Sequence, residues 1–227
     1  MGIFGWLLML VIPIIAEINV KLTYSKYSKV KNSRGLTGAQ VARRILDANG
    51  LYDTQIEHTP GNLTDHYDPR DNVVRLSDSV YASTSVAALG VAAHECGHVC
   101  QHAEAYTPIV VRSKIVPAVS VCSRLWYLVF LAGLFLTGVS SKFIVLAYIS
   151  VILFAAVVVF KIVTLPTEFD ASNRALKTLE SDSILEADEI PHARKVLMAA
   201  ALTYVASLVI SLIQFLRLLA IVRGSRR

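Results

Sequence analysis

The stretch His94-Glu95-Cys96-Gly97-His98 contains the pattern H-E-x-x-H inside a run, residues 85–105, whose composition predicts a helix. Histidines four positions apart lie one turn apart on one helical face, so both imidazoles can bind one tetrahedral zinc ion. Glu95 is then placed to take a proton from a water molecule activated by the metal. Chance explains the pattern poorly, because a chain of this length with six histidines contains it by accident roughly 0.005 times. The motif predicts a zinc-hydrolase site that binds one Zn²⁺ per chain.

The composition predicts a mainly α-helical membrane protein. Hydrophobic residues make up 54% of the chain and charged residues 17%, whereas soluble domains are roughly 45–50% apolar. Four apolar runs approach the roughly 20 residues that span a bilayer: 3–20, 115–139, 143–163 and 198–222. The first run is the weakest, because Glu17 lies near its end. A cleaved signal peptide is disfavoured there, because residues 1–5 contain no lysine or arginine and no A-x-A site follows.

Basic residues predict how the chain crosses the membrane. A cluster directly after the first run comprises Lys21, Lys26, Lys29, Lys31 and Arg34. By the positive-inside rule this flank faces the cytoplasm. The predicted segments are an anchor (1–20), a cytoplasmic peptidase segment with the motif helix (21–113), a helical hairpin (114–163), a second cytoplasmic segment (164–196) and a last membrane helix (197–222). The basic end of the chain, 223–227, would then lie outside, against the same rule.

The cytoplasmic segments predict a small α+β unit. Thr37 and Gln40 form a capping-box pattern before a helix that Asn49-Gly50 ends. A polar stretch rich in turn formers, 58–69, precedes a short strand at 72–77. Thr84 or Ser85 then caps the motif helix. Inside that helix Gly90 and Gly97 each cost about 1 kcal/mol relative to alanine, a cost that close approach of another backbone would offset.

Charge and cysteine content exclude other classes. The net charge of +5 comes mainly from basic residues beside apolar runs, where they meet lipid headgroups. No interleaving of aromatic and basic residues indicates nucleic-acid binding. The three cysteines, Cys96, Cys100 and Cys122, include no C-x-x-C pair, so we expect reduced, packed thiols. Nothing in the sequence favours a particular oligomeric state.

Two histidines need a third protein ligand to form a catalytic zinc site. His102 lies eight residues, about 12 Å, along the helix from His94, too far to share one ion. His58 and His66 lie in predicted loops and remain candidates. Glu168 is the favoured ligand, because it begins a second predicted helix, Pro166 to about Leu179, beside the third apolar run. The alternative for Glu168 is ordinary capping of that helix.

These motifs carry a family resemblance. The H-E-x-x-H stretch, the downstream Glu168-Phe169-Asp170-Ala171-Ser172, the polar segment 61–70 and the start of the last run, 200–206, resemble the bacterial membrane neutral zinc metallopeptidases of the YugP type. The resemblance implies a bacterial cell-membrane protein with a gluzincin-like unit, related to HtpX-type and CAAX-prenyl-type proteases, in which Glu168 completes the zinc ligands. The HtpX-type pattern places an aspartate where Ser172 stands here, so bracing of a ligand histidine falls to Asp170 or Ser172.

The resemblance also implies peptide-bond hydrolysis, on membrane-associated or misfolded proteins. The strand residues Val73, Val74, Arg75 and Leu76 correspond to an edge strand that pairs with substrate backbone in related peptidases, although ordinary sheet is the alternative. Candidates for stabilising the oxyanion are His192, Arg194 and Tyr204. A competing interpretation is a non-catalytic zinc-binding scaffold or regulator of a protease complex, which would not need Glu95. A metal transporter is disfavoured, because the ligands flank the membrane runs.

Overall fold

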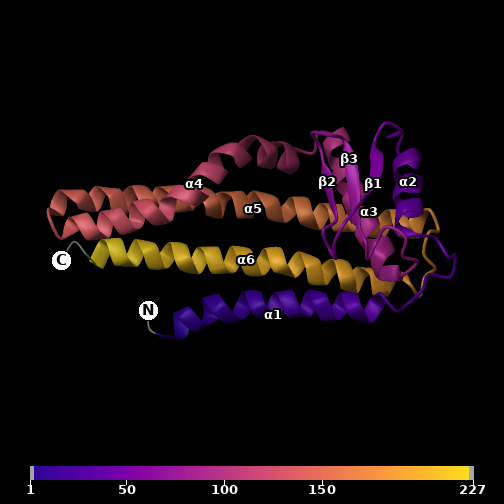
Figure 1. Ribbon diagram of the computed structural model, residues 1–227, viewed down its shortest axis with the longest axis horizontal. Helices are drawn as coiled ribbons and strands as arrows, with labels where there is room; N and C mark the ends of the chain where they lie inside the picture. Colours follow the sequence, from indigo (N-terminus) through magenta and orange to yellow (C-terminus); the bar gives the residue numbers. More distant parts are fainter. Residues whose placement is uncertain (1–2, 225–227) are drawn as a thin grey trace. The chain divides into compact units, whose positions relative to one another are not determined.

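The computed structural model describes residues 3–224, and they are mainly helical (Figure 1). In chain order the elements are α1 (Ile3–Tyr27), α2 (Gly38–Ala48), β1 (Gln55–Thr59), β2 (His66–Asp68), β3 (Val73–Ser77), α3 (Val86–Ala103), α4 (Thr107–Thr137), the 3₁₀ turn η1 (Ser141–Phe143), α5 (Ile144–Ser181) and α6 (Ile190–Gly224). The chain divides into two compact units. The first contains the described residues up to Ile15, Val110–Leu165 and the residues from Tyr204 onward. The second contains Ala16–Ile109 and Pro166–Thr203.

Three of the predicted membrane runs lie in long helices. Within the described residues α4, α5 with its preceding 3₁₀ turn, and α6 are long and apolar enough to cross a membrane. The first predicted run lies within α1, a continuous helix of 25 residues. Its membrane crossing, and with it the count of four spans, stays a prediction.

The first unit buries a cluster of large apolar side chains, including Phe130, Phe154 and Leu218. The basic residue that interrupts the third run, Lys161, has a polar partner there. Its Nζ donates to the Ser207 Oγ at 2.5 Å and lies 3.3 Å from the Ser207 carbonyl oxygen. A charged group within an apolar run requires such partners, because lipid provides none.

The second unit contains a three-stranded sheet in the order β1-β3-β2. The predicted strand at 72–77 is confirmed as β3. It pairs in parallel with β1, Gln55 opposite Val73, and antiparallel with β2, His66 opposite Arg75. The expectation that β3 is an edge strand is therefore wrong. Val73, Val74 and Leu76 are buried, which fits a central strand.

The two helices that flank the sheet begin as the sequence predicts. The capping box at α2 is confirmed, because the Gln40 amide donates to Thr37 Oγ1 and the Thr37 amide donates to Gln40 Oε1. Ser85 caps α3 by accepting from the Ala88 amide. Cys96 and Cys100 on α3 are free and buried, and burial raises the pKa of both thiols. They pack as small apolar residues.

The helix predicted to open at Pro166 is instead the continuation of α5, which runs unbroken from Ile144 to Ser181 with Pro166 inside it. A proline in a helix interior removes one backbone hydrogen bond but does not always end the helix. Glu168 therefore lies well inside a helix, and its alternative role as a helix cap is wrong.

Candidate metal centre

Helices α3 and α5 bring three potential metal ligands together in the second unit. The side chains of His94, His98 and Glu168 each offer a ligand atom, and these atoms all lie within 4.8 Å of one another. Glu168 Oε2 is 3.4 Å from His94 Nε2 and 3.6 Å from His98 Nε2. Zinc–ligand bonds of about 2.0–2.1 Å in a tetrahedron place neighbouring donor atoms about 3.3 Å apart. The two separations from Glu168 are close to this value, so the three side chains can share a single zinc ion.

Burial strengthens the interactions between the charged forms of these side chains, which shifts their pKa values. The side chains of His94, His98 and Glu168 are 15%, 12% and 3% exposed. Burial alone would raise the pKa of Glu168, but the two imidazoles outweigh it and lower that pKa below its ordinary value. Burial likewise opposes the charged form of His98, but the carboxylates of Glu168 and Glu95 raise its pKa overall. The buried Glu168 carboxylate thus favours a positive charge beside it, which a divalent cation can supply.

Ser172 orients the first histidine. Its Oγ lies 3.2 Å from His94 Nδ1, on the side of the ring away from Glu168. An Nδ1–H that donates to this hydroxyl leaves the lone pair of Nε2 facing Glu168, which is the tautomer a metal ligand requires. Ser172 occupies the position at which the related pattern has an aspartate, and it makes the predicted kind of contact.

Gln101 orients the second histidine, and sequence reasoning missed it. Its Oε1 lies 3.0 Å from His98 Nδ1, and its Nε2 donates to the Thr167 carbonyl and to Asp170 Oδ2, each at 2.8 Å. The side chain is fully buried. The available signal was a glutamine three residues after His98, on the same helical face as the motif.

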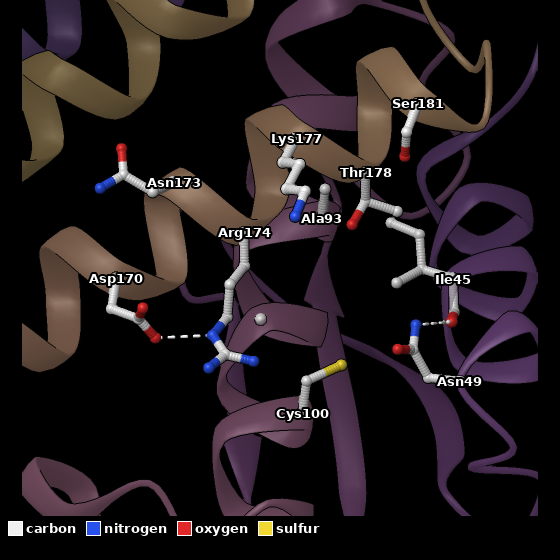
Figure 2. Close-up of a pocket in the computed structure, with 11 residues that line it drawn as sticks. Ile45, Asn49, Ala93, Cys100, Asp170, Asn173, Arg174, Lys177, Thr178 and Ser181 are labelled. Carbon is white, nitrogen blue, oxygen red and sulfur yellow. Dashed lines mark hydrogen bonds and ion pairs between the residues drawn. The ribbon is translucent and has the colours of Figure 1, made fainter.

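Asp170, the other predicted supporting residue, acts one step further out. Besides accepting from Gln101, its Oδ2 accepts from Arg174 Nε at 2.6 Å (Figure 2). Arg174 Nη1 in turn donates to Glu104 at 2.8 Å, at the end of α3. A chain of polar contacts therefore connects His98 to the exposed edge of the unit.

The close approach of α3 and α5 depends on one glycine. A Cβ at Gly97 would lie 2.8 Å from the Ala171 carbonyl oxygen and 3.2 Å from its Cα, both on the α5 backbone. Gly97 thus meets the predicted close approach of another backbone. Gly90 does not depend on one in the same way, because a Cβ there would make an ordinary 3.6 Å contact with Ala193 Cβ. The glycine between the two motif histidines lets the Glu168 helix reach them.

Glu95 is 8% exposed and lies outside the group of three ligands. The negative charge of the Glu95 carboxylate raises the pKa of His98, so the carboxylate lies close enough to influence the ligand group. The predicted role of Glu95 as a general base stays a prediction.

The remaining candidate histidines have other partners. His58 Nε2 lies 2.6 Å from Asp78 Oδ1, and His66 Nδ1 lies 2.8 Å from the Thr64 carbonyl oxygen. The His102 ring packs edge-on against Tyr67. In the part of the chain that the structure describes, none of the three histidines joins the metal-ligand group.

The predicted oxyanion donors are not brought to the metal group by any described contact. His192 stacks on the Tyr27 ring at 5.0 Å between centroids, and Arg194 is exposed at the start of α6. Tyr204 belongs to the other unit. Their role as oxyanion donors stays a prediction.

A cavity of about 470 Å³ lies beside the metal group, between α2, α3 and α5 (Figure 2). Helix α3 contributes Ala93, Gly97 and Cys100 to its wall, and α5 contributes Arg174 and Lys177. None of the three metal ligands lines it. The cavity therefore faces a different side of α3 from the metal group.

Comparisons with known proteins define the family. Residues 3–223 match the family described as "Putative neutral zinc metallopeptidase", and the chain belongs to this family. It is 47% identical over 211 residues to the Bacillus subtilis (strain 168) protein named "Putative membrane protease YugP", covering 93% of this chain and 92% of that protein. No solved structure matches this chain. The family resemblance expected from the sequence is confirmed.

Proposed function

We propose that this chain is a membrane-embedded zinc metallopeptidase in which His94, His98 and Glu168 bind one Zn²⁺ and Glu95 is the general base. The position of Glu168 carries the proposal, because its Oε2 lies 3.4 and 3.6 Å from the Nε2 atoms of the two histidines, close to the spacing of neighbouring ligands in tetrahedral zinc, and all three side chains are largely buried. Ser172 and Gln101 support it by holding both Nδ1 atoms away from the metal. This is the ligand set of a gluzincin.

The chemistry divides between the metal and the chain. When bound, zinc polarises a carbonyl group and lowers the pKa of water towards 7. Glu95 accepts a proton from the attacking water molecule while the water oxygen forms a bond to the peptide carbonyl carbon. The same carboxyl returns the proton to the amide nitrogen as the C–N bond breaks. Burial of Glu95 strengthens these interactions by excluding bulk water.

Substrates of this site are proposed to be membrane-associated or misfolded proteins. Because β3 is central, it has no free edge for a substrate. We propose that the substrate backbone pairs instead with β2, an edge strand whose one partner in the sheet is β3. Tyr67 of β2 packs against His102 of α3, so this strand lies beside the motif helix. An extended peptide can add to such an edge through backbone hydrogen bonds, with little demand on its side chains.

We place the site on the cytoplasmic side. Two apolar runs, 115–139 and 143–163, separate the motif from Glu168, and an even number of crossings returns the chain to one side. The second unit, from Ala16–Ile109 and Pro166–Thr203, supports the proposed cytoplasmic segments 21–113 and 164–196. The basic cluster Lys21 to Arg34 then favours the cytoplasm.

Replacing Glu95 with glutamine tests the proposal against a non-catalytic zinc scaffold. Glu95→Gln should keep about one zinc per chain, measured by atomic emission, but lose cleavage of casein or a membrane peptide in detergent. The matched control Glu180→Gln changes an exposed glutamate on α5 and should retain both. Loss of zinc together with activity would make Glu95 structural. Undiminished cleavage by Glu95→Gln would refute this mechanism, and zinc-loaded wild type without cleavage would favour the scaffold.

A further inference from the structure

A second surface, remote in sequence from the zinc motif, has the features of a ligand site. A groove of about 580 Å³ lies between the end of α1 and the start of α6, both within the second unit. Its walls include three basic residues, Lys26, Arg194 and Lys195, and three large apolar ones, Leu22, Met198 and Leu202. Of these residues only Arg194 has another predicted role, as an oxyanion donor, and no described contact brings it to the metal group.

The groove has a basic end and an apolar end. At the basic end the Tyr27 ring lies 5.4 Å from Lys26 Nζ and 5.9 Å from Lys195 Nζ, so the two helices hold their cations around one aromatic ring. Further along each helix, towards its apolar run, the walls contain Leu22, Met198 and Leu202, with Asn19 and Thr23 as uncharged polar neighbours on α1. Leu22 is 66% exposed and Leu202 is 44% exposed, a large apolar surface for side chains that line a groove.

The charge of the groove is unbalanced. No aspartate or glutamate lines it. Among the described residues the structure gives no ion pair between Lys26, Arg194 or Lys195 and a carboxylate. By contrast, Lys21 on the same helix α1 pairs with Glu17 at 2.6 Å. Three exposed positive charges beside exposed apolar surface are complementary to a ligand that is anionic at one end and apolar at the other.

We propose that this groove binds one anionic phospholipid. Its phosphate group lies among Lys26, Arg194 and Lys195, and its acyl chains lie along Leu22, Met198 and Leu202. Each basic side chain next to a membrane helix raises the affinity for anionic lipid roughly fivefold. A free phosphate would use the basic end alone, whereas a phospholipid also covers the apolar walls. The proposal is independent of the peptidase assignment.

Native mass spectrometry of the full-length protein tests the proposal, with dioleoylphosphatidylglycerol and dioleoylphosphatidylcholine as the probes. The wild-type protein should retain phosphatidylglycerol preferentially. Lys26→Gln with Lys195→Gln removes two groove charges and should weaken this binding about 25-fold. The matched control, Lys29→Gln with Lys31→Gln, removes two exposed charges outside the groove and should bind as the wild type does.

A second comparison separates a lipid from a free anion. Leu22→Asn should weaken phosphatidylglycerol binding without changing the groove charge, and millimolar inorganic phosphate should not displace the lipid. Equal retention of the two lipids by the wild-type protein would overturn the proposal, whether or not the variants fold. So would an equal loss in the control variant, or displacement by phosphate. If Lys26→Gln with Lys195→Gln binds lipid as the wild type does but no longer cleaves a membrane peptide, the lipid proposal is overturned and the groove is a path for substrate.

Discussion

Replacing Gly97 with alanine tests how the helix crossing builds the metal centre. The added Cβ would lie 2.8 Å from the Ala171 carbonyl oxygen, whereas ordinary contact begins at 3.4 Å, so the two backbones must separate by about 0.6 Å. Metal–ligand distances in zinc sites lie within about 0.2 Å of their standard values. Glu168 lies on the helix that would move, so it could no longer share an ion with His94 and His98. Loss of a residue that only orients a ligand lowers metal affinity about 10- to 100-fold. We expect Gly97→Ala to lower zinc affinity by about 100-fold or more, because it displaces a ligand itself.

The stability of the metal-free protein should change much less. Overpacking costs about 1–3 kcal/mol, while alanine gains about 1 kcal/mol over glycine in a helix. The net destabilisation is therefore about 0–2 kcal/mol. Competition with a chromophoric chelator measures the zinc affinity, and thermal denaturation in detergent measures the stability.

Gly90→Ala is the matched control, because it makes the same substitution in the same helix, seven residues before Gly97. Its Cβ would make an ordinary 3.6 Å contact with Ala193, so helix propensity should leave the protein as stable or up to about 1 kcal/mol more stable. Zinc affinity should be unchanged. Wild-type zinc affinity in Gly97→Ala would refute the reasoning, and so would equal losses in both variants.

Three further predictions concern the surroundings of the site. Ser172→Ala and Gln101→Leu should each weaken zinc binding about 10- to 100-fold in chelator competition, because each frees one ligand imidazole to rotate; unchanged affinity would exclude the orienting role. Because the pKa of His98 is raised above 6.5 without metal, protons compete with zinc at that ring. The zinc affinity measured by calorimetry should be highest above that raised pKa and should fall as the pH drops through it. An affinity that does not change between pH 8 and pH 6 would contradict this. Single cysteines at Asn62 and Ser183 in a cysteine-free chain should resist an impermeant maleimide in whole cells and react once the membrane is opened; labelling of one alone would separate the two halves of the site.

Features set by neighbouring residues could be predicted from the sequence. The one-turn spacing of His94 and His98, the Thr37–Gln40 capping box and the strand at 73–77 depend on local periodicity and short-range hydrogen bonds, and the structure contains all three. Glu168 was predicted for its position after an apolar run, and the structure brings it to the histidines. The supposed helix start that supported this choice is absent, so one of its two reasons was wrong.

Features set by tertiary contacts could not be predicted in the same way. A run of five residues does not show whether a strand is central or at an edge, because pairing partners decide that. The sequence predicted neither β1 nor β2, and β2 lies within the stretch 58–69, whose composition signals turns. Gln101 is an ordinary helix residue until α5 provides the Thr167 carbonyl and Asp170 that fix its amide. Pro166 predicted a helix boundary by local preference alone, and the surrounding helix overrides that preference.

The zinc content of Glu168→Ala, measured beside His66→Ala, tests the central claim most directly. Both variants are purified as full chains in detergent, exposed to equal zinc and passed over a weak chelator before atomic emission. We predict that Glu168→Ala loses the metal, because only two protein ligands remain, while His66→Ala keeps about one zinc per chain, because its ring contacts the Thr64 carbonyl instead. Retention of zinc by Glu168→Ala together with its loss from His66→Ala would contradict the proposed metal centre.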